Sequence, residues 1–161
     1  MTALTTRQGD TGWTRDASGR RVGKDDPLIE AYGALDELVC VMGWLHSACP
    51  DVHRSTVARW RAYGMSVLAG MCGGAGPDTD AVLDLETDIA RLLPEPRTGF
   101  VIPGGCEASS RAHIVRAVCR RAERRVIAAM GHESEATPVL NRLSDALFAL
   151  AVALEELHLD G

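Results

Sequence analysis

Three charged residues near the middle of the chain have the types and the spacing to bind an anion. Arg116, Arg120 and Glu123 stand at positions i, i+4 and i+7 of a helical pattern, so they share one helix face within about 60°. Two arginines one turn apart repel each other, and a bound phosphate or a partner carboxylate would offset that repulsion. A solvated basic face, with the glutamate bridging to an arginine, explains the pattern equally well.

Two other helical patterns carry polar groups that could complete such a site. Asn141 and Asp145 are one turn apart, on a face away from a stripe of leucines. An amide can satisfy an adenine-like edge, and a carboxylate can accept from a hydroxyl or an arginine. Asp36 lies beside an apolar stripe, where a carboxylate needs a partner such as an arginine of the first motif. Ordinary surface polarity and a rim position that reaches water are the alternatives.

The N-terminal segment TRQGDTGWT, residues 6–14, alternates glycine with hydroxyl-bearing and charged residues. Loops of this kind present backbone N–H groups to phosphates, and threonine and arginine side chains add donors. Asp10 could hold Mg²⁺, directly or through water, and Lys24 follows closely enough to reach a phosphate. The segment is not a Walker A loop, because GxxxxGK[ST] is absent. A flexible tail would have a similar composition.

The composition argues against several classes of protein. A chain of 161 residues suits one domain, and a net charge of −5 with 4% aromatic residues disfavours nucleic-acid binding. The five cysteines are odd in number and form no CxxC pair, which argues against a disulfide framework or a structural zinc site and fits a reducing cytoplasm. The start of the chain lacks a signal-peptide pattern, and no run approaches the ~18 apolar residues of a membrane span. We therefore expect a cytoplasmic protein with neither nucleic acid nor membrane as a partner.

Helices are the elements that must position these groups, because apolar residues recur at helical spacing in five segments. The cap signals Asp26-Pro27 and Thr137-Pro138 mark the start of the first and the fifth segment. The five predicted helices cover about 27–48, 52–72, 79–93, 107–130 and 138–157.

The order of these segments predicts an all-α fold. We expect a single domain, 1–161, in which 1–26 form an N-terminal nucleotide-binding loop and 27–157 form a five-helix antiparallel bundle. The first 26 residues are polar and glycine-rich and indicate an ordered loop or a tail, and no stretch shows strand-type alternation of useful length.

Four sequence segments match those of a known family in the same order and cover roughly half of the chain. They are TRQGDTGWT (6–14), RVGKDDPLIEAYGALDEL (21–38), FVIPGG…RAVCRRAERR (100–125) and LNRLSDALFALA (140–151). Together they resemble the PduO-type ATP:cob(I)alamin adenosyltransferases. The resemblance implies a cobalamin adenosyltransferase-like bundle that transfers the 5′-deoxyadenosyl group of ATP to cob(I)alamin, forming adenosylcobalamin and triphosphate.

The resemblance also implies an assembly and a set of ligands. The protein would be a homotrimer with active sites between subunits, and it would use ATP, Mg²⁺ and cobalamin, the last as a substrate. A reductase and an adenosylcobalamin-dependent enzyme are the further partners that it implies.

Roles for particular residues follow from the same resemblance. Asp36 and Arg116 match a pair that forms a salt bridge between subunits, and Phe100 matches an aromatic residue that helps to expel the lower axial ligand of cobalamin. With Arg120 these three make the implied catalytic set, and Glu123 is the implied Mg²⁺ ligand. The implied nucleotide contacts are Thr6, Arg7, Gly9, Asp10, Gly12, Thr14, Lys24, Arg120, Glu123 and Asn141.

Three departures from the family pattern concern mainly the corrin side of the site. Trp13 stands where the family more often has a small or polar residue, and Val152 stands where it commonly has arginine. Tyr63 lies near an expected glutamine, in the divergent region 52–78. One alternative is therefore a repurposed or non-enzymatic homologue that keeps the trimeric bundle and the nucleotide site but binds a different ligand. A plain structural bundle is the other.

Overall fold

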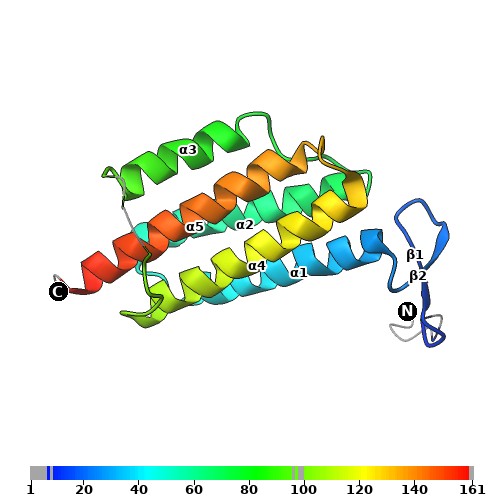
Figure 1. Ribbon diagram of the computed structural model, residues 1–161, viewed down its shortest axis with the longest axis horizontal. Coiled ribbons are helices and arrows are strands. Elements are labelled where there is room, and N and C mark those ends of the chain that lie inside the picture. Colours follow the sequence, from blue (N-terminus) through cyan, green and yellow to red (C-terminus); the bar gives the residue numbers. More distant parts are fainter. Residues whose placement is uncertain (1–6, 8, 96, 98–99, 160–161) are drawn as a thin grey trace.

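A computed structural model of the chain describes residues 7, 9–95, 97 and 100–159. Its helices run side by side along the long axis of the molecule (Figure 1), which confirms the all-α class and the five-helix bundle. Four of the five helices have 21 to 24 residues, and the third has 12. The helices are α1 Pro27–Ala48, α2 Asp51–Met71, α3 Ala81–Leu92, α4 Glu107–Met130 and α5 Ala136–Leu159.

Local signals set most of the helix ends. The Asp26 side chain accepts a hydrogen bond from the N–H of Leu28 at 2.9 Å, and Pro27 supplies a first position that needs no donor. At the end of α4, Gly131 has φ of 85°, a left-handed conformation that glycine adopts without strain. These two ends agree with the sequence prediction.

The start of α5 corrects the sequence prediction. The helix begins at Ala136 and not at Pro138. The Oγ of Ser134 accepts a hydrogen bond from the N–H of Ala136 at 3.4 Å, so the first acceptor lies before the expected start. Thr137-Pro138 is therefore part of the first turn and not the cap. Proline fits there because the first N–H groups of a helix have no partner within it.

A small β-hairpin replaces the loop or tail that we expected in the first 26 residues. Strands β1 Trp13–Arg15 and β2 Arg21–Gly23 pair antiparallel, with Trp13 opposite Gly23. Its turn is organised by Asp16, whose carboxylate accepts from Ser18 and from the backbone and side chain of Arg20 at 2.7–3.0 Å. These hydrogen bonds, first from Ser18 and then from Arg20, lower the pKa of Asp16 to about 2. Strands of three residues are too short to show an alternating pattern.

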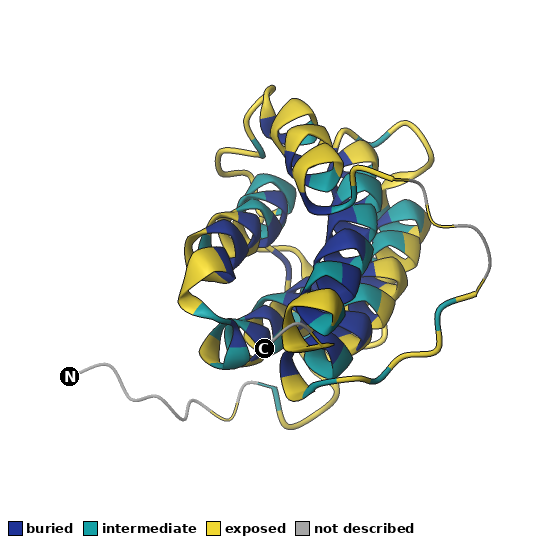
Figure 2. Cartoon of the chain, turned by 90° about the vertical axis from the view of Figure 1, so that its left-hand side faces the viewer, coloured by how far each residue is buried: buried dark blue, intermediate teal, exposed yellow. Residues whose placement is uncertain are grey.

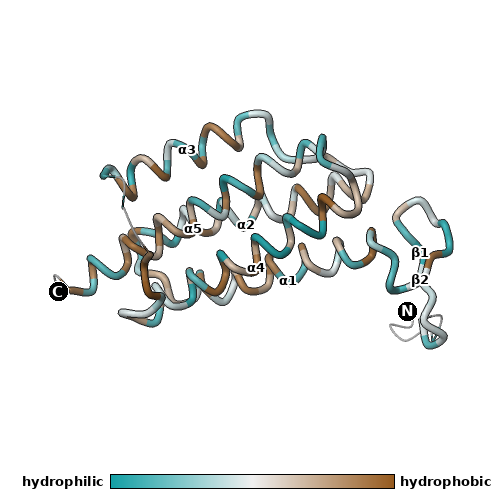
Figure 3. The backbone as a smooth tube through the Cα atoms, viewed as in Figure 1, coloured by the Kyte–Doolittle hydropathy of each residue, from teal (hydrophilic) through white to brown (hydrophobic). Residues whose placement is uncertain are grey.

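The core lies between the helices, and their outer faces are exposed (Figure 2). Apolar residues recur in short stretches between polar ones along each helix, as amphipathic packing requires (Figure 3). Helix α5 is the most enclosed, with twelve buried residues. By length and composition α5 could cross a membrane, yet 61% of its most apolar window is buried inside the bundle.

Helix α3 is attached to α2 through one buried carboxylate. Asp88 of α3, which is 5% exposed, accepts from the indole N–H of Trp60 at 2.8 Å and from Arg91 at 3.0 Å, and it also pairs with Arg59. A buried carboxylate needs this many donors to offset its desolvation. The cluster fixes α3 at the side of the bundle where the candidate site lies.

Candidate functional site

A cavity of about 360 Å³ opens between α3, α4 and α5, and it contains two of the arginines that the sequence singled out. Arg116 and Arg120 of α4 line it together with Arg142 of α5. The helical spacing that predicted a shared face for Arg116 and Arg120 therefore places both at one concave surface. Three guanidinium groups around one cavity favour an anionic ligand.

The rest of the cavity wall is mostly apolar. Ile89 and Leu93, at the end of α3, face Phe148 and Ala149 of α5 across it. A cavity with an apolar wall and a few convergent charged groups is the typical form of a small-molecule site. The sugar and base of a nucleotide could lie against the apolar wall while its phosphates meet the arginines.

The Arg120 guanidinium is held by a hydroxyl and not by a carboxylate. Its Nη1 lies 3.5 Å from Oγ of Ser144, which donates to the backbone oxygen of Asn141 at 2.9 Å. The site therefore includes the turn of α5 that carries Asn141. Neither Arg120 nor Arg116 forms an ion pair within the part of the chain that the structure describes. Their charge remains available for a ligand or another subunit.

Arg116 contacts an aromatic ring. Its guanidinium carbon lies 6.0 Å from the centroid of the Phe148 ring, and its Nε is buried with no hydrogen-bond partner among the described residues. A buried N–H without an acceptor costs free energy. An acceptor from outside this chain would remove that cost.

The third arginine of the cavity, Arg142, was not predicted as a site residue. It is neutralised by acidic side chains, with Asp145 at 2.7 Å and Glu86 at 3.8 Å. The sequence did signal this part of α5, because Asn141 and Asp145 are one turn apart. Ser144 and Phe148 continue that stripe at i+3 and i+7, so extending the helical pattern would have found them.

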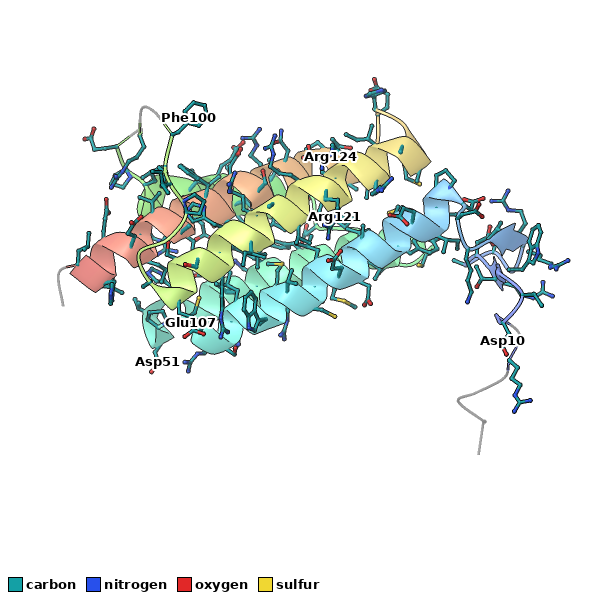
Figure 4. The ribbon with its side chains drawn as sticks, turned by 60° about the horizontal axis from the view of Figure 1, so that its bottom comes forward. Asp10, Asp51, Phe100, Glu107, Arg121 and Arg124 are labelled. Atoms are coloured by element: carbon teal, nitrogen blue, oxygen red, sulfur yellow. The ribbon has the colours of Figure 1, made fainter. Side chains whose placement is uncertain are left out.

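Two other arginines of α4 have structural partners. Arg121 pairs with Glu37, and Arg125 pairs with Glu30 at 3.2 Å, so both tie α4 to α1. Figure 4 shows Arg121 on the side of α4 that faces α1. The basic segment thus divides into residues at the cavity and residues that join helices. Glu123 lies one turn beyond Arg120 and is half-buried, but it does not line the cavity.

Residue 7 and residues 9–26 lie at the end of the bundle, beyond the start of α1 (Figure 1). Lys24 folds over Gly9, and a Cβ on that glycine would be 3.0 Å from its Nζ. This close approach explains a glycine at that position. The loop residues Arg7, Asp10 and Gly12 are exposed, Gly9 and Thr14 are half-buried, and Thr6 lies outside the described residues. None of the described loop residues lines the arginine cavity of its own chain.

Two further predicted site residues also lie apart from the cavity. Asp36 is exposed on α1, which corrects the expectation of a carboxylate close to the core of its own chain. None of the ion pairs among the described residues involves it. Phe100 is fully exposed in the connection between α3 and α4, and its ring projects from the bundle (Figure 4).

The described residues contain no group of three or more His, Cys, Asp or Glu side chains that could hold a metal ion by themselves. Mg²⁺ commonly binds with one or two carboxylates and the phosphates of a nucleotide.

A helical bundle with a cavity in which two guanidinium groups have no ion-pair partner among the described residues is suited to an anionic ligand with an apolar portion. Residues 4–154 match the model of the family described as cobalamin adenosyltransferase. The chain belongs to the cobalamin adenosyltransferase family.

Individual relatives agree with this assignment. The chain is 37% identical over 166 residues to the corrinoid adenosyltransferase PduO of Salmonella typhimurium, covering 94% of this chain and 49% of that one. It thus spans about half the length of this relative. It is 33% identical over 170 residues to a corrinoid adenosyltransferase of Citrobacter freundii, covering 94% of both.

A solved structure shows the same architecture. It is a phenylalanine-to-alanine variant of the PduO-type ATP:corrinoid adenosyltransferase of Lactobacillus reuteri, complexed with cobalamin and ATP. The TM-score is 0.88 at 25% sequence identity, with 96% of this chain and 94% of that chain covered. The comparison confirms the family resemblance that the four sequence segments indicated.

Proposed function

We propose that the protein transfers the 5′-deoxyadenosyl group of ATP to cob(I)alamin, forming adenosylcobalamin and triphosphate. The observation that carries the proposal is the pair of guanidinium groups, Arg116 and Arg120, that face one cavity without a carboxylate partner in the described chain. This arrangement suits a triphosphate. The second substrate, cob(I)alamin, is inferred from the family to which the chain belongs.

The ATP site combines groups from two helices, α4 and α5, and from the N-terminal loop. Arg120 binds the phosphates, and Arg7 and Lys24 of the loop add positive charge. The amide of Asn141 can meet the polar edge of the adenine. The Glu123 carboxylate, together with phosphate oxygens, suits Mg²⁺, which shields the charge of the triphosphate when bound.

A homotrimer with sites between subunits accounts for the separation of these groups in a single chain. The described part of the N-terminal loop lies beyond the start of α1 (Figure 1), and none of its residues lines the arginine cavity. Asp36 is exposed and Arg116 has an unpaired buried Nε. When Asp36 of one subunit meets Arg116 of the next, the carboxylate gains a positively charged partner and the guanidinium gains an acceptor. The loop of one subunit can then close over the cavity of its neighbour.

Chemistry at the site is then mainly positioning and charge stabilisation. The cobalt of the substrate cob(I)alamin attacks C5′ of ATP, the C5′–O bond breaks and triphosphate leaves with the electron pair. Arg120, Arg7 and Lys24 stabilise the negative charge that develops on the leaving group. Holding the two substrates in line removes much of the entropic cost of the encounter.

Phe100 would act on the other substrate. Cob(II)alamin is hard to reduce while a base occupies the lower axial position of the cobalt. The exposed ring of Phe100, which lies apart from the arginine cavity of its own chain, would give the corrin an apolar wall that disfavours this base and so favours the four-coordinate form. A reductase that delivers the electron, and an enzyme that uses adenosylcobalamin, are the partners that the reaction calls for.

The second candidate is a homologue that keeps the trimer and the nucleotide site but binds another ligand. The hairpin favours this possibility, because the indole of Trp13, 45% exposed, stacks under the Arg21 guanidinium at 4.5 Å. This cation–π pair places an indole beside the nucleotide loop, where the family more often has a small or polar residue.

An anaerobic assay separates the two candidates. The purified protein is mixed with ATP, Mg²⁺ and chemically reduced cob(I)alamin, and the cobalamin absorption bands are followed. Formation of adenosylcobalamin at a rate above that of a protein-free control supports the adenosyltransferase. ATP binding without formation of a cobalt–carbon bond supports the second candidate.

A further inference from the structure

One face of α4 carries buried polar atoms that have no hydrogen-bond partner among the described residues. They are Oγ of Ser109, both ring nitrogens of His113 and Nε of Arg116. Together with Arg120, these residues stand at i, i+4, i+7 and i+11, so they share one face of the helix. Unpaired buried polar atoms are rare and costly, and here they continue the face that carries the cavity arginines.

The imidazole of His113 is connected to the cavity through an aromatic ring. His113 is 4% exposed and meets Phe148 edge to face, with ring centroids 6.2 Å apart and an interplanar angle of 66°. The guanidinium of Arg116 contacts the same Phe148 ring at 6.0 Å. Two residues one turn apart on α4 therefore share a single side chain of α5, and that side chain is part of the cavity wall.

The surroundings favour the neutral form of this imidazole. Burial lowers the pKa of His113, the positive charge of Arg116 lowers it further, and Glu155 of α5 acts in the opposite direction. A neutral ring can lie edge-on to Phe148. An imidazolium would repel the neighbouring guanidinium and would prefer the face of the aromatic ring.

We propose that His113 is a positioning residue, which fixes the ring of Phe148 and through it the place of the Arg116 guanidinium in the cavity. The proposal rests on the proposed function, in which Arg116 meets the neighbouring subunit at the nucleotide site. His113 has no contact with the substrates in this scheme. Its effect passes through two side chains, each within contact distance of the next.

The test compares ATP affinity among variants of the full-length protein. His113→Ala, His113→Phe and Ile114→Ala are each measured by calorimetry with ATP and Mg²⁺, in the wild-type and in the Arg116→Ala background. We expect His113→Ala to weaken ATP binding about tenfold in the wild-type background, since residues that act through others change coupling by factors of this order. His113→Phe should restore most of the affinity, because its ring keeps the edge contact with Phe148. Ile114→Ala, at an exposed position of the same helix, should leave the affinity unchanged.

The double variants distinguish positioning from a merely structural role. If His113 acts through Arg116, His113→Ala should cause little further loss of ATP affinity once Arg116 is alanine. The same cycle is measured on the equilibrium constant of unfolding, which reports the coupling even where ATP binding is too weak to follow. An equal effect of His113→Ala in both backgrounds, or wild-type affinity of His113→Ala, would overturn the proposal. Absence of ATP binding by the wild type would count against the proposed function alone, because the unfolding cycle would still decide the role of His113.

Discussion

The guanidinium of Arg120 lies 3.5 Å from the hydroxyl of Ser144, so α4 and α5 meet at the cavity through a neutral hydrogen-bonding group. This distance is at the limit for a hydrogen bond, and the interaction is correspondingly weak. A carboxylate in the same place would neutralise the arginine before a ligand arrived. The hydroxyl orients Arg120 and leaves its positive charge for an anion.

Replacing Ser144 tests whether the charge of Arg120 must remain free. Ser144→Asp places a carboxylate beside the guanidinium, so we expect ATP affinity to fall at least tenfold, or about 1.4 kcal/mol. Ser144→Ala removes the weak hydrogen bond to Arg120 and the local one to the backbone oxygen of Asn141 but adds no charge, so it should change the affinity less than threefold. Calorimetry gives both values, and circular dichroism verifies that each variant is folded. Equal ATP affinities for the two variants would contradict this account of Arg120.

A substitution on α1 tests the contact between subunits. Asp36→Ala leaves Arg116 without its proposed partner, and stranding a buried charge costs about 3–5 kcal/mol. We expect adenosyl transfer and trimer stability to fall while the helical content of the chain is retained. Light scattering coupled to size exclusion and the anaerobic assay measure these effects.

Glu37→Ala is the matched control for that experiment. Glu37 is the next residue and pairs with Arg121 of its own chain at an exposed position, so its loss should cost less than about 1 kcal/mol. An intact trimer with full activity in Asp36→Ala would refute the pairing between subunits.

Two buried histidines predict how stability depends on pH. Burial lowers the folded-state pKa of His53 and of His113 below the usual value of 6.5, with Arg91 and Arg116 respectively adding to the effect. The unfolded chain then binds more protons than the folded chain at pH below about 6.5, so stability falls as the pH decreases through that value. Urea unfolding at pH 7.5 and at pH 5.5 should give the lower free energy of unfolding at pH 5.5.

His113→Phe provides the internal check on the pH effect. It removes one of the two titrating groups, so the difference between the two pH values should become smaller. A difference as large as that of the wild type would show that His113 does not contribute.

The carboxylate that attaches α3 to α2 offers a prediction about stability. Asp88→Ala removes the acceptor of three side chains, including the indole N–H of Trp60, and should lower the free energy of unfolding by about 1–3 kcal/mol. Asp84→Ala, at an exposed position that accepts one hydrogen bond from Tyr63, should cost less. Urea unfolding monitored by tryptophan fluorescence compares the two. A cost for Asp84→Ala equal to that for Asp88→Ala would argue against the role of Asp88 in holding α3.

Most of the fold was predictable because its signals are local. Asp26-Pro27 and Gly131 gave helix ends that the structure confirms, since capping depends on a few neighbouring residues. The predicted start of α5 was wrong because Ser134, three residues before the expected cap Thr137, provides the first acceptor. The hairpin was missed because three-residue strands carry no periodic pattern.

The site was only partly predictable because it depends on contacts between helices. Spacing placed Arg116 and Arg120 on one face, as the structure confirms. No spacing rule could show that Phe148 would contact both Arg116 and His113, since these residues are far apart in the sequence. The partner proposed for Asp36 is on another subunit, and within one chain the residue is exposed.

The most direct test of the central claim is the rate of adenosylcobalamin formation in two matched arginine variants of α4. Arg120 lines the cavity, whereas Arg125 pairs with Glu30 of α1. We expect Arg120→Ala to lower kcat/KM at least a hundredfold, because removing a donor that stabilises a developing negative charge typically costs about 10²–10³ in rate. Arg125→Ala should remain within about threefold of the wild type, since an exposed ion pair contributes little. Equal rates of adenosyl transfer in Arg120→Ala and in the wild type would contradict the claim that this cavity carries the reaction.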